Sequence, residues 1–349
     1  MKPIRIGNRT IGEGQPTFIV AEIGINHNGD VDLAKKSIQA ASIAGADSVK
    51  FQSYETDDFI REGSLTYTYE SGGKTITESQ VAMFKRCELT PPDFKMLKAY
   101  SDERNVNFHA TPTSVAGVRR LVELGVEVLK NGSDFLTRLD VVEAMGRSGL
   151  PTVLSTGMAT LAEIESAVTV FRKTGNNQLI LLHCTSSYPT AFEDVHLNRM
   201  ATLRKAFNCP VGFSDHSIGS TASIGAVALG ACWIEKHFTT DKNLPGPDHR
   251  FSVSPMELEH MVQRIREIEA CMGSPALAPS KIEAEARTQF RVSCAAACRM
   301  REGHVLSDSD IVFLRPASGL APAHKDRLIG RQTVRDLRAG ETIGMNDVN

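Results

Sequence analysis

The stretch VGFSDHSIGS (211–220) is an apolar run that ends in a histidine, and CWIEKHFTTD (232–241) repeats the same layout. Buried strands are built mainly from aliphatic residues, so a histidine has little structural use where such a strand meets solvent. We therefore interpret the two stretches as consecutive units of one repeated arrangement. Each unit presents a functional group at the end of its strand.

Six further runs of this kind precede them, and most are followed by a helical pattern such as 31–46 or 160–175, with apolar residues at i, i+3, i+4 and i+7. Strands that alternate with helices indicate a parallel sheet. Eight such units favour an α/β fold of the (β/α)8 TIM barrel type. The eight expected strands are 17–24, 47–53, 105–112, 126–133, 151–157, 178–186, 210–217 and 232–239.

Polar side chains stand at the ends of these strands, where a barrel forms its active site. His216 and His237 end neighbouring strands, so both imidazoles can meet one metal ion. Glu22 interrupts an apolar strand, which is costly for a carboxylate unless it is paired with Lys50 or bound to metal. Two histidines and a carboxylate suit a divalent transition ion such as Mn²⁺. The other strand-end residues are Gln52, Thr111, Lys130, Ser133, Ser155, His183, Ser186, Ser214 and Glu235.

Lys50 and Lys130 would end the second and fourth strands. Two lysines at one barrel mouth predict an anionic ligand with more than one charge, and phosphate plus carboxylate is the simplest combination. Hydroxyl groups of Ser133, Ser155 and Ser214 would add donors to the same anion. The alternative for either lysine is a solvated charge.

Two segments depart from the repeated pattern. TYTYESGGKTITESQ (66–80) belongs to a long insertion after the second strand, and we expect this insertion to cover the substrate. A Pro/Ala/Ser-rich linker (276–289) then separates a barrel domain (1–275) from a small domain (290–349). REGHVLSDSDI (301–311) and RAGETIGMNDV (338–348) form an internal repeat in that domain.

The bulk composition excludes several classes of protein. The formal net charge of −2 gives no indication of a nucleic-acid partner. No apolar run approaches the roughly 20 residues that a membrane span needs, and the N-terminus lacks the apolar core of a signal peptide. Seven scattered cysteines are expected to be buried and reduced, which is typical of a cytoplasmic protein.

Several motifs together resemble the sialic acid synthase family, also called the N-acetylneuraminate or nonulosonate synthases. They are VAEIGINHNGD (20–30), SVKFQ (48–52), LSTGM (154–158), LHCTSSYPT (182–190), GFSDHS (212–217), EKHFT (235–239) and PGPDH (245–249). LRPASG (314–319) and IGR (329–331) resemble the antifreeze-like (SAF) domain of the same enzymes. The resemblance implies a barrel with a C-terminal SAF domain that condenses phosphoenolpyruvate with the open-chain aldehyde of an N-acetylated amino sugar.

The resemblance also implies roles for individual residues. His216 and His237 would hold Mn²⁺, with Mg²⁺ or Co²⁺ as alternatives, and Glu22 would lie nearby. Arg315 would reach the site of the other subunit in a domain-swapped homodimer. The expected phosphoenolpyruvate-binding residues are Lys50, Thr111, Lys130, Ser133, Ser155 and Ser214. The expected sugar-binding residues are Gln52, Tyr188, Asp248 and Arg315.

One motif departs from the family pattern. Where the family often has Lys-Ile-Gly-Ser-Gly-Glu, this chain has KNGSDF (130–135), so Phe135 occupies the position of an acidic residue. Either Asp134 supplies the catalytic acid in its place, or the sugar pocket differs from that of the family. The acceptors of the family include N-acetylmannosamine, its 6-phosphate and 2,4-diacetamido-trideoxy hexoses. No second basic cluster is evident, which favours an acceptor without phosphate.

Two other functions compete with this interpretation. Lys130 at a barrel strand end could form a Schiff base with pyruvate, as in an aldolase. The substitution at Phe135 would also fit a catalytically inactive carbohydrate-binding protein.

Overall fold

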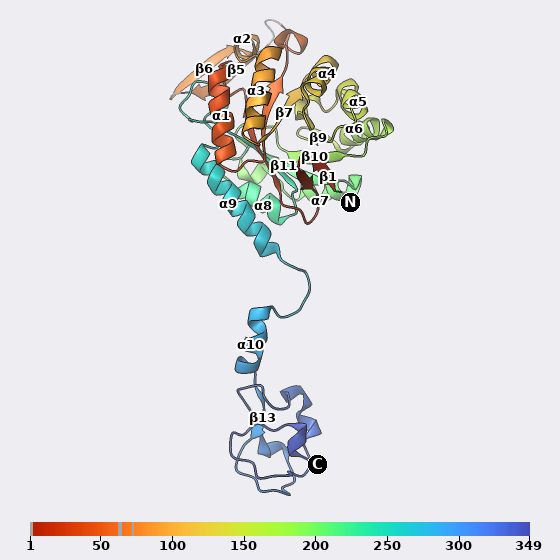
Figure 1. The fold of residues 1–349 in the computed structure, drawn as a ribbon, viewed down its shortest axis with the longest axis vertical. Helices are drawn as coiled ribbons and strands as arrows, with labels where there is room; N and C mark the ends of the chain where they lie inside the picture. Colours follow the sequence, from red (N-terminus) through yellow and green to blue (C-terminus); the bar gives the residue numbers. More distant parts are fainter. Residues whose placement is uncertain (1–2, 62–64, 72) are drawn as a thin grey trace. The chain divides into compact units, whose positions relative to one another are not determined.

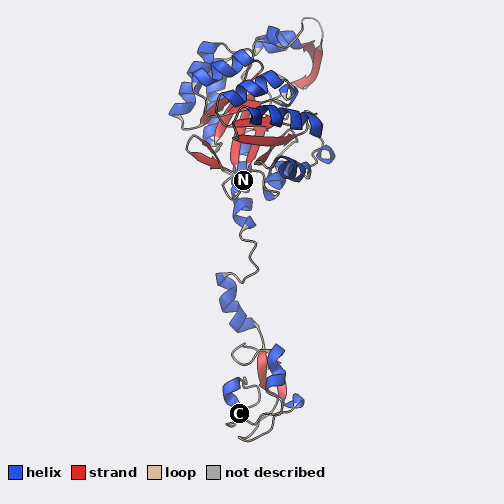
Figure 2. Cartoon of the chain, turned by 90° about the vertical axis from the view of Figure 1, so that its right-hand side faces the viewer, coloured by secondary structure: helices blue, strands red, loops and turns tan. Residues whose placement is uncertain are grey.

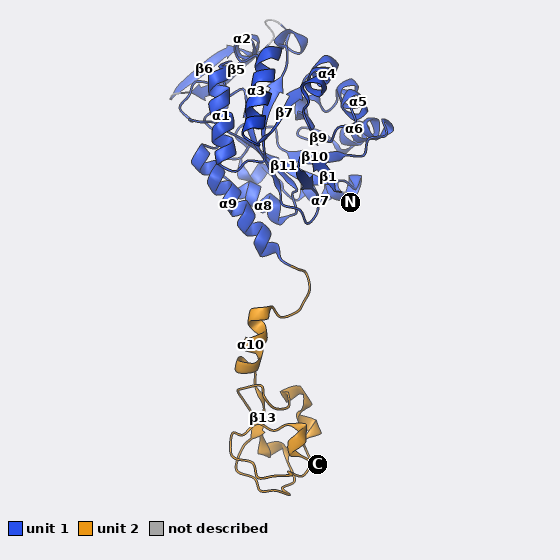
Figure 3. Cartoon of the chain, viewed as in Figure 1, with its two compact units in different colours: residues 1–273 blue, residues 274–349 orange. Residues whose placement is uncertain are grey.

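The computed structural model describes residues 3–61, 65–71 and 73–349 of the chain. It consists of two compact units, residues 1–273 and residues 274–349, drawn in different colours in Figure 3. The larger unit carries the predicted active site, and each unit is described separately below.

Eight parallel strands form the centre of the larger unit (Figure 1). Their order around the sheet is β7-β4-β3-β12-β11-β10-β9-β8, and the two end strands, β7 and β8, lie beside each other, so the barrel is nearly closed. The predicted (β/α)8 barrel is confirmed. The strands are β3 (Phe18–Gly24), β4 (Ser48–Ser53), β7 (Asn107–Pro112), β8 (Leu129–Asn131), β9 (Thr152–Ser155), β10 (Leu179–Cys184), β11 (Val211–Asp215) and β12 (Trp233–His237).

Helices surround the barrel on the outside (Figure 2). Several begin at a capping box: Thr90 pairs with Asp93, Thr160 with Glu163. Such caps satisfy backbone N–H groups that the first helical turn leaves free. The helices are α1 (Val31–Ile43), α3 (Pro91–Glu103), α4 (Val115–Leu124), α5 (Leu139–Arg147), α6 (Leu161–Lys173), α7 (Arg199–Phe207), α8 (Thr221–Ala228) and α9 (Pro255–Met272).

Two apolar clusters make up most of the core that the described residues of the larger unit form. One lies between the strands and the surrounding helices. The other fills the barrel interior, where Trp233 and Phe18 stack with ring centroids 4.7 Å apart. A short N-terminal hairpin, β1 (Ile4–Ile6) and β2 (Arg9–Ile11), adds its isoleucines to this interior core. Gly212 in β11 lets Trp233 pack closely, because a Cβ atom at Gly212 would lie 2.6 Å from Trp233 Cβ.

The insertion between β4 and β7 has a regular structure of its own. It contains the 3-10 helix η1 (Thr56–Asp58), the antiparallel strands β5 (Thr66–Ser71) and β6 (Lys74–Ser79), and α2 (Gln80–Arg86). Gly72 of the segment that we expected to cover the substrate lies outside the described residues.

The smaller unit contains α10 (Lys281–Phe290), which occupies most of the segment expected as a linker, and the antiparallel pair β13 (Ser293–Ala296) and β14 (Ile311–Leu314). The internal repeat has a structural counterpart. Asp310 accepts a hydrogen bond from Ser307 N, and at the equivalent positions Asp347 accepts one from Gly344 N, each at 2.8 Å. Both copies therefore end in the same closed turn.

All seven cysteines are free thiols, and five are buried as predicted. Cys271 and Cys298 are exposed, which the prediction of buried thiols missed because both flank apolar residues in the sequence. Among the described residues, the helices are all too short or too polar to cross a membrane.

Candidate active site

A pocket of about 380 Å³ opens at the carboxyl ends of the barrel strands. All barrel residues predicted to act in catalysis or to bind metal or substrate line it, although they come from eight different strands and the loops that follow them. These residues are Glu22, Lys50, Gln52, Thr111, Lys130, Ser133, Asp134, Ser155, Tyr188, Ser214, His216, His237 and Asp248. The strand-end residue His183 does not line it, because its ring stacks on Phe213 and its Nε2 contacts the Val195 carbonyl. Arg315 belongs to the smaller unit.

The floor of the pocket is a chain of four buried charges. Lys50 Nζ lies 3.0 Å from Glu22 Oε2 and 3.5 Å from Glu235 Oε1, and Lys130 Nζ lies 3.0 Å from Glu235 Oε1. The ion pair of Glu22 with Lys50, one of the two alternatives for Glu22, is therefore present. We call Glu22, Lys50, Lys130 and Glu235 the charged floor, and its formal charges sum to zero.

Burial and neighbouring charges set the ionisation of the charged floor. Burial raises the pKa of Glu22, and the Lys50 ammonium opposes this effect only in part. Burial would also raise the pKa of Glu235, but Lys130 and Lys50 together hold that pKa well below its usual range. Burial lowers the pKa of Lys50, but Glu22 and Glu235 more than compensate and raise it. Glu235 and Lys50 thus stay charged, and Glu22 is the group best able to take up a proton.

Hydroxyl and amide donors surround the charged floor. Lys50 Nζ donates to Thr111 Oγ1 at 3.2 Å, and Ser214 Oγ donates to Glu235 Oε1 at 3.2 Å. Gly157 N donates to Ser133 Oγ at 3.0 Å. Within the described part of the chain, Ser155 Oγ is buried without a hydrogen-bond partner. A buried hydroxyl of this kind is available to a ligand, and a phosphate or carboxylate would satisfy it.

The backbone at Gly24 bends directly above the charged floor. The pairing of β3 with β4 shifts register between Glu22 and Gly24, and Gly24 adopts a φ of 54°. A Cβ atom at Gly24 would lie 3.1 Å from Glu22 Oε1 and 3.5 Å from Gln52 Nε2. Glycine thus supplies both the left-handed backbone conformation and the space next to Glu22.

The two predicted metal-binding histidines face each other beside the charged floor. Their ring centroids are 5.4 Å apart, and the Tyr188 ring lies 4.2 Å from the ring of His216. His216 Nδ1 donates to the carbonyl of Thr185 at 2.8 Å, which leaves Nε2 free to bind a ligand. Burial lowers the pKa of His237 well below its usual value, and His216 lowers it further, so His237 is neutral.

The donor atoms at the two histidines fit a divalent metal ion. Among the described residues, the buried His237 Nδ1 has no hydrogen-bond partner, and Asp248 Oδ2 lies 3.6 Å away. Burial raises the pKa of Asp248 to about 7, the charge of Glu22 adds to the effect, and His216 opposes it only in part. Considering the described residues only, no group of three or more histidine, cysteine, aspartate or glutamate side chains is already arranged around one point.

A buried ion pair lies behind the histidines. Lys236 Nζ lies 3.0 Å from Asp215 Oδ2, and both side chains are almost completely inaccessible to solvent. Asp215 also accepts hydrogen bonds from Ser217 N at 2.8 Å and from Ser223 Oγ at 2.6 Å. The pair connects β11 to β12 one residue before each histidine.

A second network holds the loop that carries Asp248. Asn26 Nδ2 donates to the Phe238 carbonyl and to Ser252 Oγ, both at 2.9 Å, and Ser252 Oγ donates to the Asp248 carbonyl at 2.6 Å. Asn28 Nδ2 donates to the Pro245 carbonyl at 2.8 Å. The loop after β3 therefore fastens the loop after β12 above the histidines.

Three of the four predicted sugar-binding residues, Gln52, Tyr188 and Asp248, line the pocket. The fourth, Arg315, has its guanidinium 5.5 Å from the ring centroid of Phe290 within the smaller unit. This contact is a cation–π interaction. Phe290 is exposed, so the pair lies on the surface of that unit.

The sequence interpretation missed two parts of the pocket. Glu235 was recognised as a strand-end residue, but its pairing with both lysines was not. The apolar side of the pocket, which includes Phe59, Phe84 and Phe135, was not predicted either. The sequence did indicate this apolar side, through the aromatic residues Tyr54, Phe59 and Phe84 in and around the insertion.

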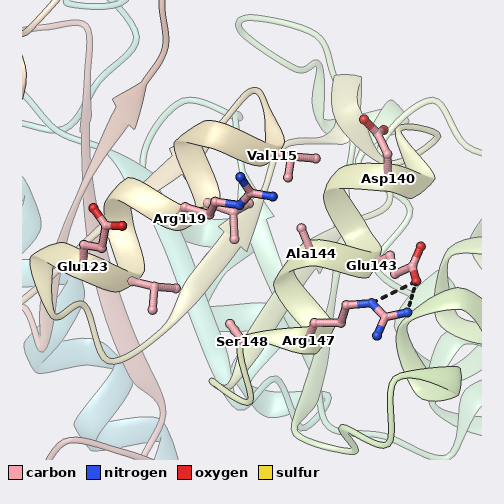
Figure 4. A pocket seen from close by; sticks show the side chains of 10 residues that line it. Val115, Arg119, Glu123, Asp140, Glu143, Ala144, Arg147 and Ser148 are labelled. Atoms are coloured by element: carbon pink, nitrogen blue, oxygen red, sulfur yellow. Dashed lines mark hydrogen bonds and ion pairs between the residues drawn. The ribbon is translucent and has the colours of Figure 1, made fainter.

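A separate groove of about 480 Å³ lies between α4 and α5 (Figure 4). Valine side chains, including Val115, line it, and Arg147 pairs with Glu143 at its edge. It contains no predicted site residue, and it lies on the helical layer outside the barrel.

Comparison with known proteins places the whole chain among related sequences. Residues 37–276 match the model of the NeuB family, and residues 291–349 match that of the SAF domain. The N,N'-diacetyllegionaminic acid synthase of Legionella pneumophila is 38% identical over 341 residues, which cover 97% of this chain and 96% of the relative. The enzyme of the same name from Campylobacter jejuni is 38% identical over 329 residues, or 94% and 98% of the two chains.

A solved structure is similar as well. The N-acetylneuraminic acid (sialic acid) synthetase of Leptospira borgpetersenii serovar Hardjo-bovis, crystallised with citrate, is 38% identical with a TM-score of 0.75. The match covers 82% of this chain and 95% of that one.

Proposed function

Because the chain belongs to the NeuB family, we propose that it condenses phosphoenolpyruvate with the open-chain aldehyde of an N-acetylated amino sugar, to give a nonulosonic acid and inorganic phosphate. One observation supports this most directly. Two buried lysines and two buried histidines line a single pocket at the carboxyl end of a barrel. The lysines suit an acid that carries both phosphate and carboxylate, and the histidines suit the metal-assisted activation of an aldehyde.

The proposed reaction has balanced steps. C3 of phosphoenolpyruvate attacks the aldehyde carbon and forms the new C–C bond, while the aldehyde oxygen takes up a proton and becomes a hydroxyl. Water adds at C2, and the C–O bond to phosphate then breaks. Phosphate leaves, and C2 becomes the keto group of the product. The new C–C bond and the loss of phosphate make the reaction irreversible in practice.

Phosphoenolpyruvate is assigned to the charged floor. Lys50 and Lys130 would bind its anionic groups, with hydroxyl donors from Thr111, Ser133, Ser155 and Ser214. The lysines already pair with Glu22 and Glu235, so the ligand must share or displace these carboxylates. Glu22, with its raised pKa, is the carboxyl group that would be protonated when Lys50 turns to the ligand.

The remaining site residues are assigned to the acceptor. A divalent ion such as Mn²⁺, when bound by His216 and His237, would act as a Lewis acid for the aldehyde oxygen. Gln52, Tyr188 and Asp248 would orient the sugar, and Asp134 is the carboxylate proposed to exchange a proton with it. Arg315 would contact the sugar from the partner of a domain-swapped homodimer.

The experiment is phosphate release from phosphoenolpyruvate with Mn²⁺ and unphosphorylated N-acetylated sugars, including N-acetylmannosamine. Release that depends on a sugar, stops with EDTA and is lost in His216→Ala would support the proposal. Release that is unchanged in His216→Ala would contradict the metal assignment. Absence of release with any sugar, together with tight sugar binding, would favour the carbohydrate-binding protein.

The pyruvate aldolase is the second candidate function. A Schiff base requires an amine that is free to attack the keto group of pyruvate, whereas Lys130 Nζ lies 3.0 Å from Glu235 Oε1 in a buried ion pair. Borohydride reduction in the presence of pyruvate distinguishes the two functions. Covalent trapping of pyruvate on Lys130 would favour the aldolase.

A further inference from the structure

A buried histidine lies beside the charged floor, and the proposed reaction does not use it. His109 in β7 pairs in register with Lys50 of β4, so both side chains point into the barrel. Trp233 and Glu235 stand two residues apart on β12 and therefore share the same interior face. The rings of His109 and Trp233 meet edge-to-face with centroids 5.7 Å apart. Burial lowers the pKa of His109 and the charge of Glu235 opposes this effect, so these two residues are also close enough to interact.

Each of these three residues has a buried polar atom without a hydrogen-bond partner among the described residues. The atoms are His109 Nε2, Trp233 Nε1 and Glu235 Oε2. The exposed fractions of the three residues are 0%, 0% and 4%, so bulk solvent does not reach them. Buried polar atoms in native proteins are nearly always paired, because an unpaired atom has lost its water without compensation. Three such atoms that face one region of the barrel interior indicate a partner that they share.

The surrounding contacts assign a hydrogen-bonding role to each atom. Ser48 Oγ donates its hydrogen to the Asn107 carbonyl at 2.8 Å, so His109 Nδ1, which lies 2.8 Å from Ser48 Oγ, carries the proton of that contact. Burial lowers the pKa of His109 to about 3, so the ring is neutral and its Nε2 is an acceptor. Trp233 Nε1 can only donate, and the carboxylate of Glu235 can only accept. The three atoms therefore comprise one donor and two acceptors.

One water molecule matches this set of partners. It would accept a hydrogen bond from Trp233 Nε1 and donate its two hydrogen atoms to His109 Nε2 and Glu235 Oε2, and three bonds are typical of a buried water. A cation would meet the indole N–H, and an anion would meet the carboxylate. We propose that His109 and Trp233 hold one buried water molecule against Glu235 Oε2, and that this water positions Glu235 in the charged floor.

The two carboxylate oxygens of Glu235 then have separate tasks. Oε1 lies 3.0 Å from Lys130 Nζ and 3.5 Å from Lys50 Nζ. The water holds Oε2 from the barrel interior and keeps the carboxylate from rotating away from the lysines. His109 and Trp233 do not line the pocket, so they are positioning residues that act on bound phosphoenolpyruvate only through Glu235. The effect on phosphoenolpyruvate rests on the proposed function, whereas the water itself does not.

A high-resolution crystal structure of the full chain tests the water directly. We expect one ordered water oxygen within about 3.2 Å of His109 Nε2, Trp233 Nε1 and Glu235 Oε2. The structure of His109→Leu should lack this water. His109→Gln should keep it, because the side-chain oxygen of glutamine can replace Nε2 as the acceptor. A direct hydrogen bond between His109 and Glu235, or no ordered water between the three atoms in the natural chain, would overturn the inference.

Calorimetric titration with phosphoenolpyruvate tests the positioning role. His109→Leu should weaken binding by roughly tenfold, about the effect of one lost hydrogen bond, and His109→Gln should restore it to within about threefold of the natural chain. When Glu235 is already replaced by glutamine, His109→Leu should have no further effect, because the group through which His109 acts has lost its ion pairs. An equally large loss of affinity in that double variant would show that His109 acts through the fold in general.

A second variant covers the case in which His109→Leu does not fold. Trp233→Phe removes the indole N–H and keeps an aromatic ring, and it should also weaken the binding of phosphoenolpyruvate. Unchanged affinity in every folded variant would overturn the positioning role. If the natural chain did not bind phosphoenolpyruvate at all, the proposed function itself would be contradicted, while the crystal structure would still decide whether the water is present.

Discussion

Lys236 Nζ and Asp215 Oδ2 lie 3.0 Å apart in a fully buried ion pair, and each residue immediately precedes one of the two facing histidines. The pair thus fixes the relative position of the ends of β11 and β12 from the side that the ligand does not reach. The charged residues that precede the histidines in SDH (214–216) and EKH (235–237) are therefore the two members of this ion pair.

Lys236→Met should lower the free energy of unfolding by about 3–5 kcal/mol, because it leaves the buried carboxylate of Asp215 without its cation. The double variant Lys236→Met with Asp215→Asn removes both charges and should recover most of this loss. The amide oxygen can keep the hydrogen bonds from Ser217, and the amide NH2 can donate to Ser223 Oγ in place of the bond that Asp215 accepts. Urea unfolding of the three proteins measures both effects. If the unfolding free energy of Lys236→Met lay within about 1 kcal/mol of that of the natural chain, the ion pair would contribute little to stability.

Glu235→Gln should tighten the binding of phosphoenolpyruvate several-fold while it destabilises the protein. The substitution changes the charged floor from net zero to net positive, which favours an anion, but it leaves Lys130 without a carboxylate in a buried position. Calorimetric titration with phosphoenolpyruvate and urea unfolding separate the two effects. Weaker binding in a variant that remains folded would mean that Glu235 orients the lysines rather than competing with the ligand.

His109→Gln should reduce the pH dependence of stability. Burial lowers the pKa of His109 to about 3, whereas an unfolded chain has a histidine pKa near 6.5. Between these values only the unfolded state takes up the proton, so the natural chain loses about 1.4 kcal/mol per pH unit at this residue as the pH falls. The difference between the unfolding free energies at pH 6 and at pH 5 should therefore be smaller in the variant than in the natural chain, by about that amount.

Asp248 also makes the stability depend on pH, but it does so equally in the natural chain and in the variant. Its pKa is raised to about 7, so it contributes stability at low pH that is lost as the pH rises through 7, the opposite sign to His109. Both proteins contain Asp248, and its contribution cancels in their difference. Identical slopes in the two proteins would contradict the buried neutral state of His109.

Gly212→Ala should destabilise the barrel by about 1–3 kcal/mol, because the new methyl group would overlap the backbone oxygen of Trp233, 2.6 Å away. Gly225→Ala is the matched control. It lies in α8, and its closest neighbour is the Leu197 methyl group at 3.2 Å, which can move. Thermal unfolding should show a loss for Gly212→Ala only, and equal effects would argue against close packing at β11.

Arg315→Ala and His216→Ala should complement each other when their subunits are mixed, if Arg315 acts in the site of the partner. Each variant alone should be nearly inactive. Random exchange in a homodimer would then restore roughly a quarter of the natural activity, because half of the dimers contain one intact site. Mixtures that stay inactive after demonstrated subunit exchange would show that Arg315 does not act in the partner's site.

The parts of the structure that follow local rules were predictable from the sequence. The eight strands could be recognised because each apolar run ends in a polar group, and the site residues gather because carboxyl ends of parallel strands meet. The pairing of Lys130 with Glu235 was not predictable, since β8 and β12 are separated by three strands in the sheet and meet only across the barrel interior.

Two other features were missed for different reasons, one because it depends on a long-range contact and one because a local signal was overlooked. The apolar side of the pocket requires Phe59, in the insertion between β4 and β7, to pack against Phe135, which follows β8. Helix α10 was overlooked because Pro and Ala dominate the segment before it, although Ser280 and Glu283 form a capping box that marks its start.

The N-terminal hairpin can complete its packing only late in the synthesis of the chain. Ile4, Ile6 and Ile11 share their core with Cys232 and Trp233, so the hairpin can complete its packing only after β12 has been translated. At synthesis rates of about 5–20 residues per second the interval between the hairpin and β12 is roughly ten to fifty seconds. During that time the apolar side chains of the hairpin remain without their final packing. A large N-terminal fusion would hinder the last step of barrel closure.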